Sequence, residues 1–209
     1  MSRTLLLIDG SIAGLVALAA ESDRTARDTE PSLVWAADLT SHLDPTEVEA
    51  CRKAVSVQAG IYGFEMVVHP MLTASSRASD QSAALLRVAH EAARLGCRRV
   101  VWSVQFPYIG SEPDLDIIAS TVDRGLLVSR LASLDIWDQS ERTVPEVRIE
   151  TPYVDLSDDQ LADLALDLSV SIASVWWLSA QTPGAMHART RWRSLLQDVG
   201  LLAASRSVS

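Results

Sequence analysis

The chain has only two cysteines, Cys51 and Cys97, among its 209 residues. They stand far apart in sequence, and neither has a second potential metal ligand nearby at the spacing that metal sites use. This count excludes the disulfide framework of a small secreted protein. We therefore expect both thiols to pack as small buried apolar groups, and we expect a cytoplasmic location because the chain suits a reducing compartment.

Basic residues are scarce as well, since 18 Lys and Arg stand against 27 Asp and Glu, and the net charge is −9. Nucleic acids bind to clustered Lys and Arg, so no nucleic-acid partner is expected. The sequence also contains no run of about 18 apolar residues, so no membrane partner is expected. One local basic cluster, Arg189, Arg191 and Arg193, is predicted to be a solvated helix face.

The usual catalytic patterns are missing too. The sequence has no G-x-S-x-G elbow, no Walker A lysine motif and no G-x-G-x-x-G. Its histidines are scattered without metal-site spacing, at His42, His69, His90 and His187. The acidic pair Asp158-Asp159 falls in the first turn of an expected helix, where carboxylates favour the helix dipole, so we predict a capping role for it.

What the sequence does contain is a regular alternation of short apolar runs with longer helical segments. Strands are predicted at 4–8, 32–37, 64–68, 98–104 and 146–150. Helices are predicted at 12–21, 45–61, 81–95, 114–134, 157–168 and 185–199. The second helix has the clearest start, since Asp44 is a good N-cap and Pro45 suits the first helical position. This alternation predicts an α/β fold with a doubly wound, mostly parallel five-stranded sheet.

We expect one domain over residues 1–209, with a C-terminal helical extension and a fraying tail at 201–209. The double tryptophan Trp176-Trp177 lies in that extension. Either ring could stack on a base, but neighbouring residues of a strand point to opposite faces. Core packing should therefore account for at least one of them.

The first strand and helix are joined by Asp9-Gly10-Ser11, and Gly14 follows in the helix. In doubly wound sheets ligands bind at the carboxyl ends of the strands. Small residues at such a turn let backbone N–H groups approach a phosphate, and the helix N-terminus adds positive potential. The four residues Asp9, Gly10, Ser11 and Gly14 are therefore the candidate nucleotide-binding loop. The alternative is a plain turn with Asp or Ser as the helix cap.

Two segments of the last quarter carry a family resemblance. One is E-T-P-Y-V-D-L-S, residues 150–157, and the other is P-G-A-M-H-A-R-T-R-W-R, residues 183–193. They resemble E-T-P-L-x-D-L-(S/T) and P-C-G-x-C-x-x-C-x-x-R of the 7-cyano-7-deazaguanine synthases of queuosine synthesis, a branch of the PP-loop ATP pyrophosphatases. The resemblance implies a PP-loop, Rossmann-like fold.

In that family four cysteines of this region, 170–200 here, bind a zinc ion. The matching positions of this chain are Ala180, Gly184, His187 and Thr190. Of these only His187 can bind a metal, and a structural zinc site needs four ligands. We therefore expect no zinc.

The resemblance extends to the first turn, where the family has S-G-G-x-D-S and this chain has D-G-S-I-A-G. Gly10 is kept, whereas Asp9 replaces a serine and Ala13 replaces an aspartate. A carboxylate at Asp9 would face the pyrophosphate of ATP. At about 4 Å and an effective dielectric near 20, such a pair of like charges costs roughly 4 kcal/mol.

Two further segments match the family in part. Ser76-Arg77-Ala78 keeps only the arginine of a G-R-N segment. The run 103–116 resembles G-V-N-x-x-D-Y-S-G-Y-P-D-C-R, with Gln105 in place of asparagine, Asp114 kept and an arginine replaced by Asp116. The resemblance makes Arg77, Gln105 and Asp114 the candidate substrate-pocket residues.

The leading hypothesis is a degenerate relative that has lost zinc and ATP pyrophosphatase activity and acts as a binding or scaffold pseudoenzyme. We assign it no catalytic residue and no cofactor, and we expect a protein partner or a homodimer. Two alternatives stay open. One is an ATP-dependent adenylating carbon–nitrogen ligase of 7-deazapurine synthesis that uses ATP and Mg²⁺, and the other is a nucleotide sensor without turnover.

Overall fold

A computed structural model describes residues 3–25, 31–40, 43–75, 77–108, 112–138 and 146–203. Its strands are β1 (Arg3–Ile8), β2 (Leu33–Asp38), β3 (Glu65–Met66), β4 (Leu72–Thr73), β5 (Cys97–Trp102) and β6 (Arg148–Glu150). Its α-helices are α1 (Ile12–Thr25), α2 (Pro45–Ile61), α3 (Ala78–Arg94), α4 (Leu115–Asp138), α5 (Asp158–Asp167), α6 (Trp176–Ser179) and α7 (Pro183–Asp198). A 3₁₀ turn, η1 (Ile172–Ser174), precedes α6.

The strands form one parallel sheet in the order β3-β2-β1-β5-β6, and β4 adds a short pairing to β2. The chain proceeds from β1 outward to one edge and then crosses to β5 on the other side of β1. The strand order thus reverses between β1 and β5, which is the topological switch point of a doubly wound sheet. The predicted fold class is confirmed, with β4 as a sixth, very short strand.

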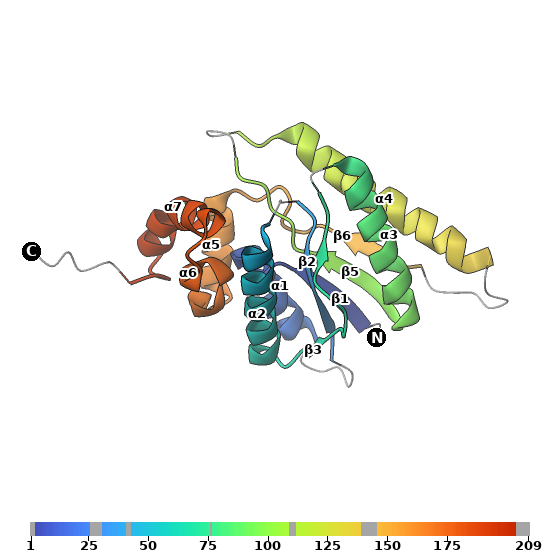
Figure 1. The fold of residues 1–209 in the computed structure, drawn as a ribbon, viewed down its shortest axis with the longest axis horizontal. Coiled ribbons are helices and arrows are strands. Elements are labelled where there is room, and N and C mark those ends of the chain that lie inside the picture. Colours follow the sequence, from blue (N-terminus) through green and yellow to red (C-terminus); the bar gives the residue numbers. More distant parts are fainter. Residues whose placement is uncertain are drawn as a thin grey trace, which may run out of the picture.

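Helices cover both faces of the sheet (Figure 1), and the side chains of β1 show how they divide. Leu6 and Ile8 pack in the core beneath α1 and α2, whereas Leu5 and Leu7 pack beneath α3 and α4. All four are at most 1 % exposed. A strand that is buried on both faces needs such a continuous apolar run, which is why T-L-L-L-I predicted β1.

The C-terminal extension consists of α5, η1, α6 and α7, drawn in orange and red on the left of Figure 1. It packs on the α1–α2 face, with α5 against α1 and α6 against α2. Trp176 and Trp177 form the helical turn α6 and do not lie on a strand, so the expectation that their side chains point to opposite faces of a strand was wrong. Both rings enter one core, with Trp176 at 9 % and Trp177 at 2 % exposure, so both serve packing.

Most predicted boundaries are close to the observed ones. The capping box of Asp44 and Glu47 starts α2 at Pro45, as expected. The third strand is much shorter than predicted, because the chain leaves the sheet after Met66 and Val68 is 96 % exposed. Both cysteines are buried thiols, as predicted. His42, Ser76 and residues 204–209 of the predicted tail lie outside the described residues.

A buried ion cluster lies at the amino ends of the central strands. Glu21 of α1 is 3 % exposed and accepts hydrogen bonds from Arg24, at 2.6 and 2.9 Å, and from Ser32 at 2.9 Å. Arg99 of β5 joins Glu21 at 2.7 Å to Glu150 at 2.6 Å. The cluster links α1 to β5 and β6.

None of the helices in the described parts of the chain combines the length and apolar character that crossing a membrane needs.

Candidate functional site

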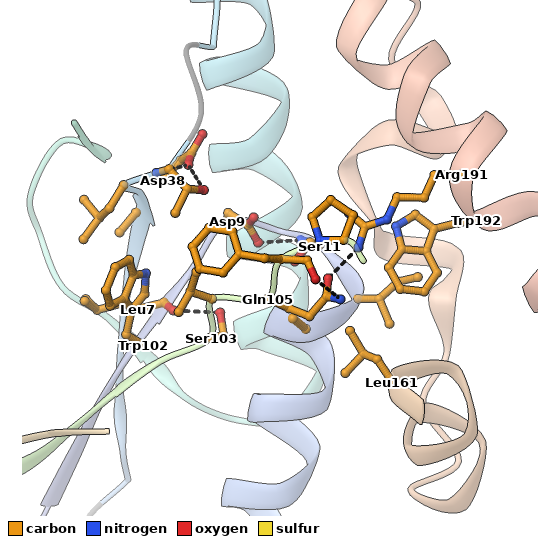
Figure 2. Close-up of a pocket in the computed structure, with 18 residues that line it drawn as sticks. Leu7, Asp9, Ser11, Asp38, Trp102, Ser103, Gln105, Leu161, Arg191 and Trp192 are labelled. Atoms are coloured by element: carbon orange, nitrogen blue, oxygen red, sulfur yellow. Dashed lines mark hydrogen bonds between the residues drawn. The ribbon is translucent and has the colours of Figure 1, made fainter. Parts of the chain in front are cut away.

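A cavity of about 320 Å³ opens at the carboxyl ends of β1, β2 and β5 (Figure 2), where the strand order reverses. The C-terminal extension forms its opposite wall through α5 and α7. The cavity therefore lies where doubly wound sheets usually bind ligands, between the sheet and the extension.

The turn after β1 is stabilised by hydrogen bonds between its own residues. Asp9 Oδ1 accepts a hydrogen bond from the backbone N–H of Ser11 at 2.9 Å, and Ser11 Oγ accepts one from Gly14 N–H at 3.4 Å. The carbonyl of Ser11 accepts the first helical bond, from Leu15. Ser11 is thus the cap of α1. The N–H groups that a phosphate loop would present to its ligand are partly taken up by the chain's own side chains.

Gly10 faces the protein core instead of the cavity. Its φ of +82° favours glycine, and a Cβ there would lie 3.0 Å from Cβ of Ala54 on α2. Its carbonyl accepts hydrogen bonds from Gln58 Nε2 at 3.0 Å and from Trp176 N–H at 3.1 Å. Gly14 is also a packing position, because a Cβ would lie 3.0 Å from Cβ of Ile8. Both glycines let helices approach β1 closely.

Two carboxylates face this end of the sheet. Asp38, at the end of β2, is 4 % exposed and accepts hydrogen bonds from the N–H and hydroxyl of Thr40, at 3.0 and 3.3 Å. Burial, together with the negative charge of Asp38, raises the pKa of Asp9 above its ordinary value. The floor of the cavity is therefore an acidic environment in which ionisation of Asp9 is costly.

A polar bridge closes the side toward the extension. Gln105 donates through Nε2 to the carbonyl of Leu156 at 2.9 Å and to Asp158 Oδ1 at 3.0 Å. Arg191 of α7 donates to Gln105 Oε1 at 2.6 Å and to Asp158 Oδ2 at 2.7 Å. The bridge joins the loop after β5 to α5 and α7, and thereby holds the extension against the cavity.

Aromatic rings form the apolar walls. Trp102 ends β5, Phe106 follows it, and Trp192 comes from α7. The Arg191 guanidinium lies over the Trp192 ring, 4.8 Å from its centroid. At the back, the Ser103 hydroxyl donates to the carbonyl of Leu7 at 2.9 Å and so ties β5 to β1. The cavity thus combines acidic, amide and aromatic surfaces.

Of the residues predicted for a site, Asp9, Ser11 and Gln105 line this cavity. Arg77 and Asp114 do not: Arg77 is exposed just before α3, and Asp114 caps α4 by accepting from Ile117 N–H at 3.1 Å. Tyr108, in the loop after β5, donates its hydroxyl to the carbonyl of Asp155 at 2.8 Å.

Residues at the positions matched to zinc-binding cysteines make hydrogen bonds to other residues of this chain. Gly184 donates its N–H to the Glu47 carboxylate at 2.9 Å, and the Ala180 carbonyl accepts from Arg189 at 2.8 Å. His187 is exposed. Nowhere in the described parts of the chain do three His, Cys, Asp or Glu side chains gather as they would around a metal ion.

Three site residues were missed from the sequence. Asp38 had a usable signal, since it directly follows the second predicted strand, as Asp9 directly follows the first. Arg191 was predicted to lie on a solvated face, but it is part-buried in the bridge to Asp158. Asp158 lies in the first helical turn as predicted, and its side chain binds Arg191. The pairing of Asp158 with Arg191 had no local signal, because 33 residues separate them.

No protein-family model matches the sequence, and no curated protein is significantly similar to it. Among solved structures, the chain is similar to the U34-tRNA thiolase NcsA from Methanococcus maripaludis, solved with its 4Fe–4S cluster. That match has 12 % identity and a TM-score of 0.48, and covers 96 % of this chain and 72 % of that one. The conserved protein TT1542 from Thermus thermophilus matches at 15 % identity and a TM-score of 0.38, over 96 % of this chain and 90 % of that one.

Proposed function

We propose that this protein is a non-catalytic binding protein, a PP-loop-type pseudoenzyme whose cavity takes a small organic cation instead of ATP. The observation that carries the proposal is the 2.9 Å hydrogen bond from Ser11 N–H to Asp9, formed beside the buried carboxylate of Asp38. The resemblance to 7-cyano-7-deazaguanine synthases supports this ancestry, and the altered turn supports the proposed loss of that activity.

The turn disfavours a phosphate in two ways. Asp9 and Ser11 already accept hydrogen bonds from the backbone N–H groups of Ser11 and Gly14. In addition, a phosphate at this turn would meet the charge of Asp9. Each pair of like charges at about 4 Å costs roughly 4 kcal/mol at an effective dielectric near 20. Together these effects remove most of the affinity that a helix N-terminus offers an anion.

The same features favour a cation. A bound cation would stabilise the ionised form of Asp9, whose pKa is raised by burial and by the charge of Asp38. Arg191 also lines the cavity, but it directs its donors to Gln105 and Asp158. The rings of Trp102 and Trp192 could stack on an apolar or aromatic part of the ligand and attract its charge. We therefore assign the ligand to the class of small aromatic or aliphatic amines and amidines.

The pair of carboxylates is also the observation that favours an ATP-dependent ligase or a nucleotide sensor. Carboxylate oxygens are the ligands that Mg²⁺ prefers, and Mg²⁺ held by Asp9 and Asp38 would turn an acidic floor into a site for Mg-ATP. This second function requires that nucleotide binding depend on both Mg²⁺ and these two aspartates.

Thermal unfolding separates the two functions. The protein is heated with millimolar benzamidine, tyramine or agmatine, and separately with Mg-ATP, Mg²⁺ alone or AMP. A ligand at about 100 times its Kd adds roughly 2.7 kcal/mol, a shift of several degrees for a chain of this size. We expect a shift with at least one organic cation and none with Mg-ATP or AMP.

The variants Asp9→Asn and Asp38→Asn should abolish the shift. Asp163→Asn removes the same charge from the exposed face of α5, outside the residues that line the cavity, and should keep the shift. A shift with Mg-ATP that Asp9→Asn removes would replace the proposal by the nucleotide-binding function. The absence of any response to the three cations would contradict the ligand class.

A further inference from the structure

The outer face of α4 carries an apolar surface that none of the described helices or strands covers. Leu126, Leu127, Leu131 and Leu134 are 60, 70, 46 and 55 % exposed. The inner face of the same helix packs against α3 and β6 through buried residues such as Ala132, which is 0 % exposed. Figure 1 shows α4 at the upper right margin of the molecule, with α3 and the sheet to one side of it. Four exposed leucines grouped on one helix mark an interaction surface, since soluble proteins expose apolar residues mostly singly.

Two opposite charges flank Leu126 and Leu127 along the helix. Asp123 and Arg130 are both exposed, and their spacing of seven residues, nearly two helical turns, places them on the same side of α4. Neither forms an ion pair with any side chain that the structure describes. The point halfway between them falls between Leu126 and Leu127.

This spacing makes the face complementary to itself. If two copies of α4 lie antiparallel about a two-fold axis beside Leu126 and Leu127, Asp123 of each copy lies opposite Arg130 of the other. Leu126 and Leu127 of each copy then meet those of the second copy between the two ion pairs, and Leu131 and Leu134 lie beyond the ion pairs, opposite Val122 and Ala119 of the second copy. A two-fold interface requires this reciprocity, in which residue i contacts j and j contacts i. Because each face contributes one charge of each sign, the net charge of −9 does not oppose contact at this place.

We propose that the protein forms a two-fold homodimer through an antiparallel pair of α4 helices, centred on Leu126 and Leu127 and aligned by two Asp123–Arg130 ion pairs. The cavity described above is lined by other elements, so this dimer does not depend on the proposed function. The second copy is favoured over a different protein because one helix supplies both halves of the charge pattern at matching distances.

Sedimentation equilibrium at about 1–100 µM tests the dimer. We expect a mass near twice 22.7 kDa for the unaltered chain. Leu127→Glu should weaken the dimer at least a hundredfold. Leu166→Glu makes the same change at a leucine of α5 that is 45 % exposed, and should leave the mass unchanged. Circular dichroism and cooperative unfolding establish that each variant is folded.

Charge exchange tests the register. Asp123→Arg and Arg130→Asp should each weaken the dimer at least tenfold, because each creates two pairs of like charges across the axis. The double variant restores both ion pairs and should recover the original Kd within about threefold. A chain that is monomeric throughout the concentration range, a Leu127→Glu variant that stays dimeric, or a double variant without recovery would each overturn the proposal.

Discussion

Glu47 and Gly184, 137 positions apart in the chain, are joined by a hydrogen bond in which the Gly184 N–H donates to Glu47 Oε1 at 2.9 Å. The other oxygen of the same carboxylate accepts from Asp44 N–H at 3.2 Å. Through these two hydrogen bonds Glu47 contacts the first turn of α7 and completes the cap of α2. Its side chain is buried, with 6 % exposure. Gly184 stands where the resembled family has a zinc-binding cysteine. In this chain the Glu47 carboxylate accepts a hydrogen bond at the N-terminus of α7 and so holds that helix against α2, an arrangement that the helix dipole favours.

Gly184→Ala should destabilise the protein, because a Cβ at this position would overlap Glu47 Oε1. We expect a loss of about 1–3 kcal/mol in the free energy of unfolding, measured by urea denaturation. Gly60→Ala in α2 is the matched control, since no atom lies within 4 Å of its Cβ position. Alanine there should stabilise the helix by about 0.5–1 kcal/mol. Equal effects of the two substitutions would show that Glu47 does not hold α7.

Asp9→Asn should stabilise the protein at pH 7. Burial and the charge of Asp38 raise the folded-state pKa of Asp9 above its ordinary value of 3.8, so the folded state loses stability as the pH rises from 3.8 through that raised pKa. Asparagine is neutral and keeps an oxygen for the Ser11 N–H. Its advantage, followed by urea denaturation from pH 4 to 7, should grow with pH, whereas Asp163→Asn should show no such growth. A less stable Asp9→Asn variant at pH 7 would contradict this account.

Glu21→Gln should show the opposite dependence on pH. Burial acts to raise the pKa of Glu21, but hydrogen bonds from Arg24, Thr4 and Ser32 outweigh it and hold the pKa below the ordinary 4.5. The ionised carboxylate therefore contributes stability that is present above pH 4.5 and is lost as the pH falls below it. We expect Glu21→Gln to cost about 3 kcal/mol at pH 7, because Arg99 loses a buried charged partner. Urea denaturation should find the difference from the unaltered chain shrinking toward pH 3, and a constant difference would refute the role of ionisation.

Arg191→Lys should weaken the bridge between α7 and the loop after β5. The guanidinium donates hydrogen bonds to Asp158 and to Gln105 at the same time. A single ammonium group cannot make both hydrogen bonds in the same geometry. We expect a loss of about 2 kcal/mol in the free energy of unfolding by urea denaturation. Arg98→Lys, at an exposed position of β5, should change it by less than about 0.5 kcal/mol. If the two lysine variants proved equally stable, the bridge would not hold the extension.

The candidate site was predictable only in part. Asp9 and Ser11 could be located because they directly follow an apolar strand, and Gln105 was located through the family resemblance of the run 103–116. Arg77 and Asp114 precede helices and lie outside the cavity, since a position near a strand or helix end does not decide which way the chain leaves the sheet. Arg191 was placed on a surface because its partners lie 33 and 86 residues earlier in the chain.

Local sequence was enough to predict the alternation of strands and helices, the start of α2 at the Asp44 cap, and the apolar strand that lies buried at the centre of the sheet. These features follow from the period of apolar side chains and from hydrogen bonds within one turn, which act over a few residues. The folded chain was needed to show that Glu47 contacts Gly184, that Gly10 faces α2 and α6, and that Asp9, Asp38 and Arg191 line one cavity. Such contacts depend on how whole helices and strands pack, and no local propensity encodes them.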